Sequence, residues 1–117
     1  SSFFQVTFNL LDNAVKYAHE DPSQFCIQIW AERLVTGIEI YFEDNGIGIP
    51  SESREWVFRR GARLQQRSGP FGNGLGLWAV RRIVERHGGS IRIVDPRRGG
   101  VTCFAISLPP SAVHQEA

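Results

Sequence analysis

Apolar residues recur at helical spacing in two stretches of the chain, residues 2–18 and 75–89. In the first stretch, one apolar stripe is expected to face a core: Phe3, Val6, Leu10, Ala14 and Tyr17. A second apolar stripe runs beside it: Phe4, Phe8, Leu11 and Val15. Two stripes exceed what contact with one core requires, so we expect part of the second to face a segment outside this sequence.

The second helical stretch has a similar core-facing set and a clear end. Its core-facing residues are Leu77, Val80, Ile83 and Val84, and Gly88 stands where a helix C-cap is expected. Residues 50–58 begin with Pro-Ser before acidic residues, which is typical of a short helix start. Residues 59–74 are polar, basic, glycine-rich and aperiodic, so we expect a mobile loop.

Apolar and polar residues alternate in four other stretches, which predicts strands. Residues 25–32 and 38–44 predict an antiparallel hairpin in which Ile38, Ile40 and Phe42 point inward. On the same strand Glu39, Tyr41 and Glu43 are expected on a solvent-exposed face. Residues 90–95 and 100–109 complete the sheet. The order of elements predicts an α+β two-layer sandwich, with helices packed on one face of a mostly antiparallel mixed sheet.

Composition places the chain among ordinary single domains. It has 117 residues, 42% hydrophobic residues and a formal net charge of +1, so bulk charge gives no reason to expect nucleic-acid binding. We expect one domain over residues 1–110 and a flexible tail over 111–117. No apolar run approaches the roughly 20 residues of a membrane span. The two cysteines lack CxxC spacing and are expected as thiols in a reducing cytosol, so a cytoplasmic location is predicted.

Five glycines lie in two short clusters, "DNGIGIP" and "GNGLGLW". Glycines let backbone N–H groups approach phosphate oxygens closely, and the second cluster precedes a predicted helix N-terminus. Neither a P-loop nor a Rossmann fingerprint is present, because the required spacings are missing. The predicted basic loop between the clusters offers further phosphate partners: Arg59, Arg60, Arg63 and Arg67.

The first helix carries a polar stripe beside its core-facing stripe. Asn13 can offer an amide oxygen to a hard divalent cation, and Lys16 can place a point charge on phosphate. Asn9 lies one turn before Asn13. Asp44 ends an inward-facing strand, where its carboxylate could accept a hydrogen bond from an exocyclic amine or could cap an Asx-turn. The residues alone leave both roles of Asp44 open.

Four ordered motifs together resemble a known family. The stretches "NLLDNAVKY", "DNGIGIP", "VFRRGAR" and "GNGLGLW" resemble the N, G1, F and G2 boxes of the catalytic and ATP-binding domain of sensor histidine kinases. This domain belongs to the wider superfamily of DNA gyrase, Hsp90 and MutL. The resemblance runs from about Phe3 to Pro109. The F box departs from the pattern, since it lacks the usual aromatic pair after Phe58.

The resemblance implies ATP and Mg2+ as cofactors and assigns roles to individual residues. Asn13 would hold Mg2+, and Asp44 would accept a hydrogen bond from the adenine amine. The resemblance places a catalytic set at Asn9, Asn13, Lys16 and Arg63. The nucleotide would also be lined by Tyr17, Gly46, Gly48, Ile49, Arg59, Gly72, Gly74, Leu75, Gly76, Leu77 and Thr102.

Residue 9 separates a kinase from a hydrolysing relative. Hydrolysing members carry a glutamate there, whereas Asn9 cannot take a proton from water as a carboxylate can. The resemblance therefore implies transfer of the γ-phosphate to a histidine on a separate helical dimerisation domain, and indirectly to a response regulator. The three histidines of this chain lack the family's phosphoacceptor pattern: His19, His87 and His114. Neither nucleic acid nor a membrane is an expected partner of this domain.

Two other hypotheses remain. The first is an ATPase clamp, which fast hydrolysis would support. The second is a non-catalytic nucleotide-binding module, which binding of ATP without transfer to a histidine would support.

Overall fold

The computed structural model describes residues 2–16, 22–62 and 76–111. Two helices, α1 (Ser2–Lys16) and α2 (Gly76–Arg86), accompany four strands. The strands are β1 (Ile27–Leu34), β2 (Gly37–Asp44), β3 (Ser90–Val94) and β4 (Thr102–Leu108). Three short 3-10 turns complete the described elements: η1 (Pro22–Gln24), η2 (Ser51–Ser53) and η3 (Trp56–Phe58). The short helix expected within residues 50–58 is thus two separate turns.

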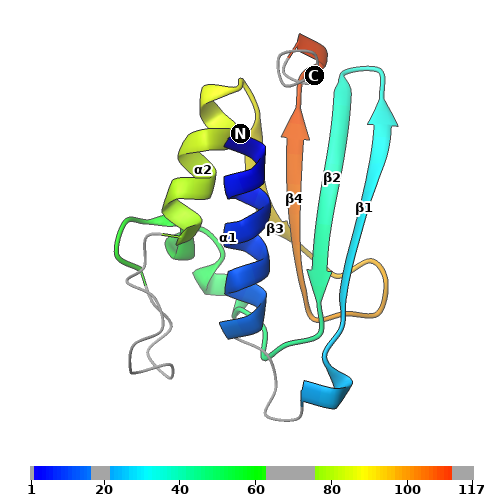
Figure 1. Cartoon of the computed structure of the whole chain (residues 1–117), viewed down its shortest axis with the longest axis vertical. Coiled ribbons are helices and arrows are strands. Elements are labelled where there is room, and N and C mark those ends of the chain that lie inside the picture. The colour runs from blue at the N-terminus through cyan, green and yellow to red at the C-terminus, as the bar shows by residue number, and fades with distance from the viewer. Residues whose placement is uncertain (1, 17–21, 63–75, 112–117) are drawn as a thin grey trace.

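The strands form one sheet in the order β1-β2-β4-β3, and each neighbouring pair is antiparallel. Both helices lie on the same face of this sheet (Figure 1). The predicted two-layer sandwich is confirmed, and the described strands make a fully antiparallel sheet rather than a mixed one. Strand β4 returns between β2 and β3, which places the start of β4 beside the end of β2.

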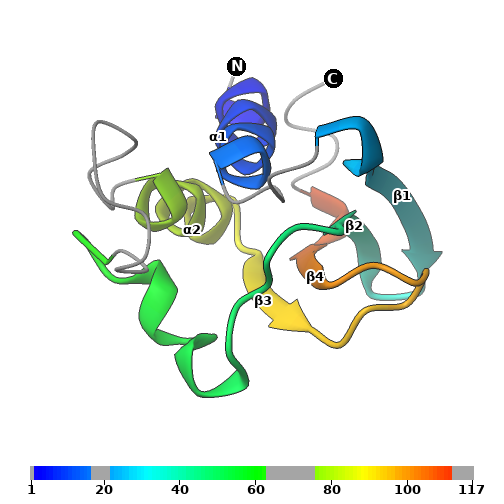
Figure 2. The ribbon, with the colours of Figure 1, turned by 90° about the horizontal axis from the view of Figure 1, so that it is seen from below.

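The core lies between the helices and the sheet. Val6 and Leu10 of α1 and Val80 and Val84 of α2 are all buried in one cluster with Phe104. These residues belong to the predicted core-facing stripes, because residues three and four apart share one face of a helix. Seen from below, α1 and α2 lie next to each other on one side of the sheet (Figure 2).

The second apolar stripe of α1 remains on the surface of the described part of the chain. The exposed fractions are 71% for Phe4, 57% for Phe8 and 63% for Val15. Its expected contact with a segment outside this sequence stays a prediction. Neither described helix is long and apolar enough to cross a membrane.

One expectation about the sheet is wrong. Tyr41 and Glu43 were expected on a solvent-exposed face of the sheet, yet each is only 1% exposed. The segment between β3 and β4 folds over this face, and Trp30 stacks on Tyr41 with ring centroids 5.0 Å apart. Alternation identified the correct face for each side chain but could not show that a loop would cover it.

Candidate functional site

Asp44 ends β2 with a buried side chain. The residue is 8% exposed, and its Oδ1 accepts the backbone N–H of Gly46 at 2.8 Å. Burial raises the pKa of the Asp44 carboxyl; the Gly46 hydrogen bond lowers it by less, and the nearby Glu43 charge also raises it. The Asx-turn considered for this residue is therefore present. No donor from the described residues reaches the second carboxylate oxygen, Oδ2.

The first glycine cluster bends sharply after Asp44. Gly48 has φ +88°, and a Cβ on it would lie 2.9 Å from Cγ1 of Val101, so a larger residue would be strained and crowded. Gly46 is buried. Ile49, partly buried, packs against the main core and anchors the loop. The predicted need for glycine here is explained at Gly48 by its backbone conformation.

The polar stripe of α1 meets the start of α2. Asn9 Nδ2 donates a hydrogen bond to the carbonyl oxygen of Gly76, at a long 3.4 Å. Asn13 follows one helical turn later and is partly buried; among the described residues its side chain has no hydrogen-bond partner. Lys16 is the last residue of α1. Tyr17 and the side chain of Lys16 lie outside the described part of the structure.

The second glycine cluster is only partly described. Gly76 begins α2, and Leu77 is buried in the core. No described atom lies within 4 Å of a Cβ placed on Gly76, so packing gives no reason for glycine there. Several residues predicted for the nucleotide lie outside the described ranges: Arg63, Arg67, Gly72, Gly74 and Leu75.

The F box is anchored by its phenylalanine. Phe58 is 2% exposed and meets Phe104 edge-on, with ring centroids 6.2 Å apart. Arg59 is exposed, as a predicted phosphate partner must be. Arg60, in contrast, lies with its guanidinium 5.4 Å from the ring centroid of Trp78 on α2. Arg60 therefore packs against α2, a contact that its predicted role as a phosphate partner did not include.

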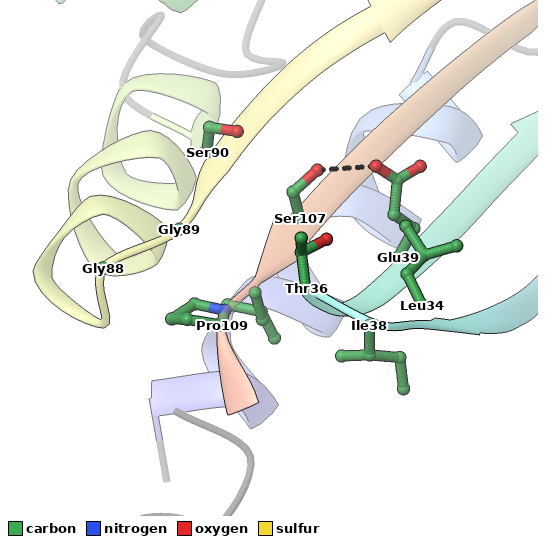
Figure 3. A pocket seen from close by; sticks show the side chains of 10 residues that line it. Leu34, Thr36, Ile38, Glu39, Gly88, Gly89, Ser90, Ser107 and Pro109 are labelled. Atoms are coloured by element: carbon green, nitrogen blue, oxygen red, sulfur yellow. Dashed lines mark hydrogen bonds between the residues drawn. The ribbon is translucent and has the colours of Figure 1, made fainter. Parts of the chain in front are cut away.

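A separate hollow of about 300 Å³ lies at the end of β2 and β4 that is opposite to Asp44 and Thr102 (Figure 3). Glu39 of β2 and Ser107 of β4 line it and are joined by a hydrogen bond of 3.0 Å. None of the described residues predicted for nucleotide binding lines this hollow. Two of the residues predicted for nucleotide binding, Asp44 and Thr102, lie at the other end of the sheet.

The family described as "Histidine kinase-, DNA gyrase B-, and HSP90-like ATPase" matches residues 1–112. The chain belongs to this family. Membership covers nearly its whole length and confirms the resemblance carried by the four boxes.

Individual members of the histidine kinase-like ATPase family are clearly similar. The adaptive-response sensory kinase SasA of Synechococcus sp. (strain CC9311) is 39% identical over 108 residues, 90% of this chain and 27% of that protein. The sensor protein KdpD of Escherichia coli (strain K12) is 39% identical over 107 residues, 92% of this chain and 12% of that protein. The chain thus spans about a quarter or less of these two relatives.

Solved histidine kinase structures share the fold. A mycobacterial sensor histidine kinase, MprB, superposes with a TM-score of 0.78 at 32% identity, covering 92% of this chain and 72% of that one. The nucleotide-free catalytic domain of the histidine kinase ThkA gives a TM-score of 0.73 at 27% identity, covering 93% of this chain and 66% of that one. The two-layer arrangement of this ATPase-family domain is therefore that of histidine kinase catalytic domains.

Two residues of this ATPase-family domain hold the site together and were missed by sequence analysis. Asn45 Oδ1 accepts the N–H of Cys26 at 2.8 Å, and its Nδ2 donates to the carbonyl of Gln24 at 2.6 Å. Glu43 holds the loop after β3 from the other face of the sheet. An Asn directly after a strand-ending Asp is a usable signal for Asn45. The partners of Glu43 lie more than 50 residues away, and alternation cannot reveal them.

Proposed function

We propose that this domain binds ATP with Mg2+ and transfers the γ-phosphate to a histidine on a separate helical dimerisation domain of its parent protein. A response regulator would receive the phosphate from that domain indirectly. The observation that carries the proposal is the buried Asp44 carboxylate, whose Oδ2 has no donor among the described residues. This oxygen is not fully enclosed by the described residues, so it keeps contact with solvent and can accept a hydrogen bond from a ligand.

An adenine amine is the donor that suits Asp44. The exocyclic amine of adenine offers N–H groups, whereas a 6-oxo purine offers an acceptor that would face the carboxylate. Thr102 lies directly opposite Asp44 on β4 and is 5% exposed, so both side chains share the helix-covered face at this end. The proposed base site is thus formed by Asp44, Thr102 and the bend at Gly46–Gly48.

The phosphates are proposed to lie where α1 meets the start of α2. The Asn9–Gly76 contact brings the N box and the end of the second glycine cluster together. None of the described residues lies within 4 Å of a Cβ placed on Gly76, and the α2 N-terminus suits an anion. The proposal also includes contributions from Lys16, Tyr17, Ile49, Arg59, Arg63, Gly72, Gly74, Leu75 and Leu77.

Asn13 is the proposed Mg2+ ligand. A partly buried amide oxygen with no partner among the described residues fits a hard cation that keeps most of its waters and binds phosphate oxygens. When bound, the ion would neutralise charge on the transferred phosphoryl group. The described residues contain no group of three His, Cys, Asp or Glu side chains that could hold a metal by themselves. A magnesium ion held by one protein side chain and by phosphate oxygens is compatible with the lack of such a group.

Asn9 favours transfer over hydrolysis. An amide cannot act as the general base for water, so bound ATP would persist until a histidine acceptor arrives. In phosphoryl transfer the protein mainly positions groups and stabilises charge, and the residues named here can do both. The parent is proposed to act in two-component signalling in the cytoplasm, without nucleic acid or membrane contact by this domain.

The test combines binding with transfer. Calorimetry with MgATP should show binding to this chain. Incubation with γ-labelled ATP and the histidine-bearing helical domain of the parent should then label that domain with an acid-labile, alkali-stable phosphate. Rapid release of free phosphate by the chain alone would instead support an ATPase clamp. Binding without any transfer would support a non-catalytic module, and absence of binding would overturn the proposal.

A further inference from the structure

Glu43 is a buried carboxylate that the proposed function does not use. Its side chain is on the face of the sheet opposite the helices, and it is 1% exposed. It accepts three backbone N–H groups, from Arg97 at 2.6 Å, Arg98 at 2.8 Å and Gly100 at 2.8 Å. Burial alone would raise the pKa of the Glu43 carboxyl, but these donors together hold that pKa below its usual value.

These bonds fasten the β3–β4 segment, residues 97–101, across the sheet. Side chains of the same segment add two ring contacts. The Arg98 guanidinium lies 4.0 Å from the ring centroid of Trp30, and that of Arg97 lies 4.6 Å from the ring centroid of Tyr41. Gln28 Nε2 donates to the carbonyl of Arg98 at 3.1 Å. The segment is therefore held at several points on β1 and β2.

The far end of segment 97–101 returns to the proposed base site. Val101 N donates to the carbonyl oxygen of Asp44 at 2.7 Å. A Cβ on Gly100 would lie 2.9 Å from that same oxygen and 2.7 Å from Cγ of Glu43, so the segment passes in direct contact with β2. Cγ1 of Val101 also lies against the bend at Gly48. Segment 97–101, which Glu43 holds, thus contacts both the main chain of Asp44 and the bend after it.

Adjacent residues of a strand point to opposite faces, which explains how Glu43 can act without touching a base. Its carboxylate is held from the helix-free face, while the next side chain, Asp44, points to the helix-covered face. Discrimination between hydrogen-bonding ligands depends on a fixed geometry of the acceptor. A backbone held in place by segment 97–101 supplies that geometry.

We infer that Glu43 is a positioning residue for purine discrimination: through segment 97–101 it fixes the main chain of Asp44 and the Gly48 bend, and so aims the Asp44 carboxylate at a 6-amino group. This inference rests on the proposed binding of ATP. It adds that selectivity for the 6-amino over the 6-oxo purine depends on a residue that touches no ligand.

The test compares ATP with inosine triphosphate, its 6-oxo counterpart. Calorimetry gives the dissociation constants of both magnesium nucleotides for the wild type and for Glu43→Gln. The amide keeps the volume but has only one acceptor oxygen for three N–H donors. We expect ATP to bind about tenfold more weakly, which corresponds to one lost charge-assisted hydrogen bond. Affinity for inosine triphosphate should change less than about twofold, so the ratio of the affinity for ATP to the affinity for inosine triphosphate falls.

Two further variants separate positioning from loss of structure. Gly100→Ala keeps Glu43 but pushes a methyl group against Asp44 and Glu43, and it should lower the same ratio. Glu39→Gln is the matched control, because Glu39 is on the same strand and face but binds Tyr41 and Ser107 at the other end. It should lower the melting temperature and leave the nucleotide ratio unchanged.

The outcomes distinguish the two proposals. If Glu43→Gln or Gly100→Ala weakens both nucleotides equally, or if Glu39→Gln lowers the ratio as much, the inference is overturned while wild-type ATP binding still stands. If the wild type binds neither nucleotide, the proposed function fails and the inference fails with it. Should Glu43→Gln not fold, Gly100→Ala decides the question by the same ratio.

Discussion

Asp44 and Thr102 lie directly opposite each other in the antiparallel pairing of β2 and β4. Both are buried, at 8% and 5% exposed, although both are polar. The second carboxylate oxygen of Asp44 receives no donor from the described residues and is not fully enclosed, so it can accept a hydrogen bond from solvent or from a ligand. This arrangement is compatible with the proposed base site.

The first prediction concerns Asp44→Asn. The folded state raises the pKa of this carboxyl above the 3.8 of an unfolded chain, so ionisation above about pH 4 costs folding stability. The neutral amide removes that cost, and its oxygen can still accept the Gly46 N–H. We expect the ligand-free variant to melt at the same temperature as the wild type or higher at pH 7. Its amide N–H would face the adenine amine, so MgATP should no longer raise the melting temperature.

Thermal denaturation with and without MgATP checks this prediction. The wild type serves as the positive control for the nucleotide effect. A variant that keeps the full ATP-induced shift would show that Asp44 does not bind the base.

The second prediction concerns Asn13→Ala. Asn13 has no side-chain hydrogen bond among the described residues, so its removal should change the free energy of unfolding by less than about 0.5 kcal/mol. Magnesium should lose its effect on binding, so that calorimetry gives similar ATP affinities with Mg2+ and with a chelator. Asp12→Ala is the neighbouring control and should keep the magnesium dependence. Persistent magnesium dependence in Asn13→Ala would assign the ion to another ligand.

Most of the fold was predictable from periodicity. The core stripes of α1 and α2 were identified correctly because Val6, Leu10, Val80 and Val84 follow helical spacing and have a single core to face. Gly88 ends its helix as expected, with φ +81°. These are local signals, in which each residue's neighbours along the chain determine its conformation.

The missed features depend on contacts that are distant in the sequence. Burial of Tyr41 and Glu43 comes from the loop after β3, which alternation along β2 cannot report. The stacking of Arg60 on Trp78 likewise joins residues on two separate elements. For the candidate site, the sequence placed Asp44 at the end of a strand and Gly48 in the loop after it, as the structure has them. Their roles toward a nucleotide stay predictions.

The third prediction is a loss of stability at alkaline pH. Burial, with smaller contributions from nearby carboxylates, raises the pKa of Tyr41 to about 12 from 10.0 and that of Cys103 to about 12 from 9.0. For an acid whose folded pKa is raised, the folded state retains a proton that the unfolded chain releases. Stability should therefore fall from about pH 9 upward, first through Cys103 and then through Tyr41.

Urea denaturation between pH 7 and 10.5 measures this slope. Cys103→Ser keeps a donor for Glu43 but does not ionise in this range, so its stability should fall less steeply between pH 9 and 10. Cys26→Ser is the matched control, because Cys26 is exposed, and it should keep the wild-type slope. Equal slopes in all three proteins would contradict a buried, protonated Cys103.

The last prediction concerns the anchor of the F box. Phe58 is 2% exposed and contacts Phe104 edge-on, so Phe58→Ala should leave a cavity and lower the free energy of unfolding by about 3–4 kcal/mol. Trp56→Ala, two residues earlier and 39% exposed, should cost about 1 kcal/mol or less. Urea denaturation compares the two. Because Phe58 directly precedes Arg59, a proposed phosphate partner, Phe58→Ala should also weaken MgATP binding at a temperature where the variant remains folded. Equal costs for both variants would show that Phe58 is not the point at which this segment is attached to the core.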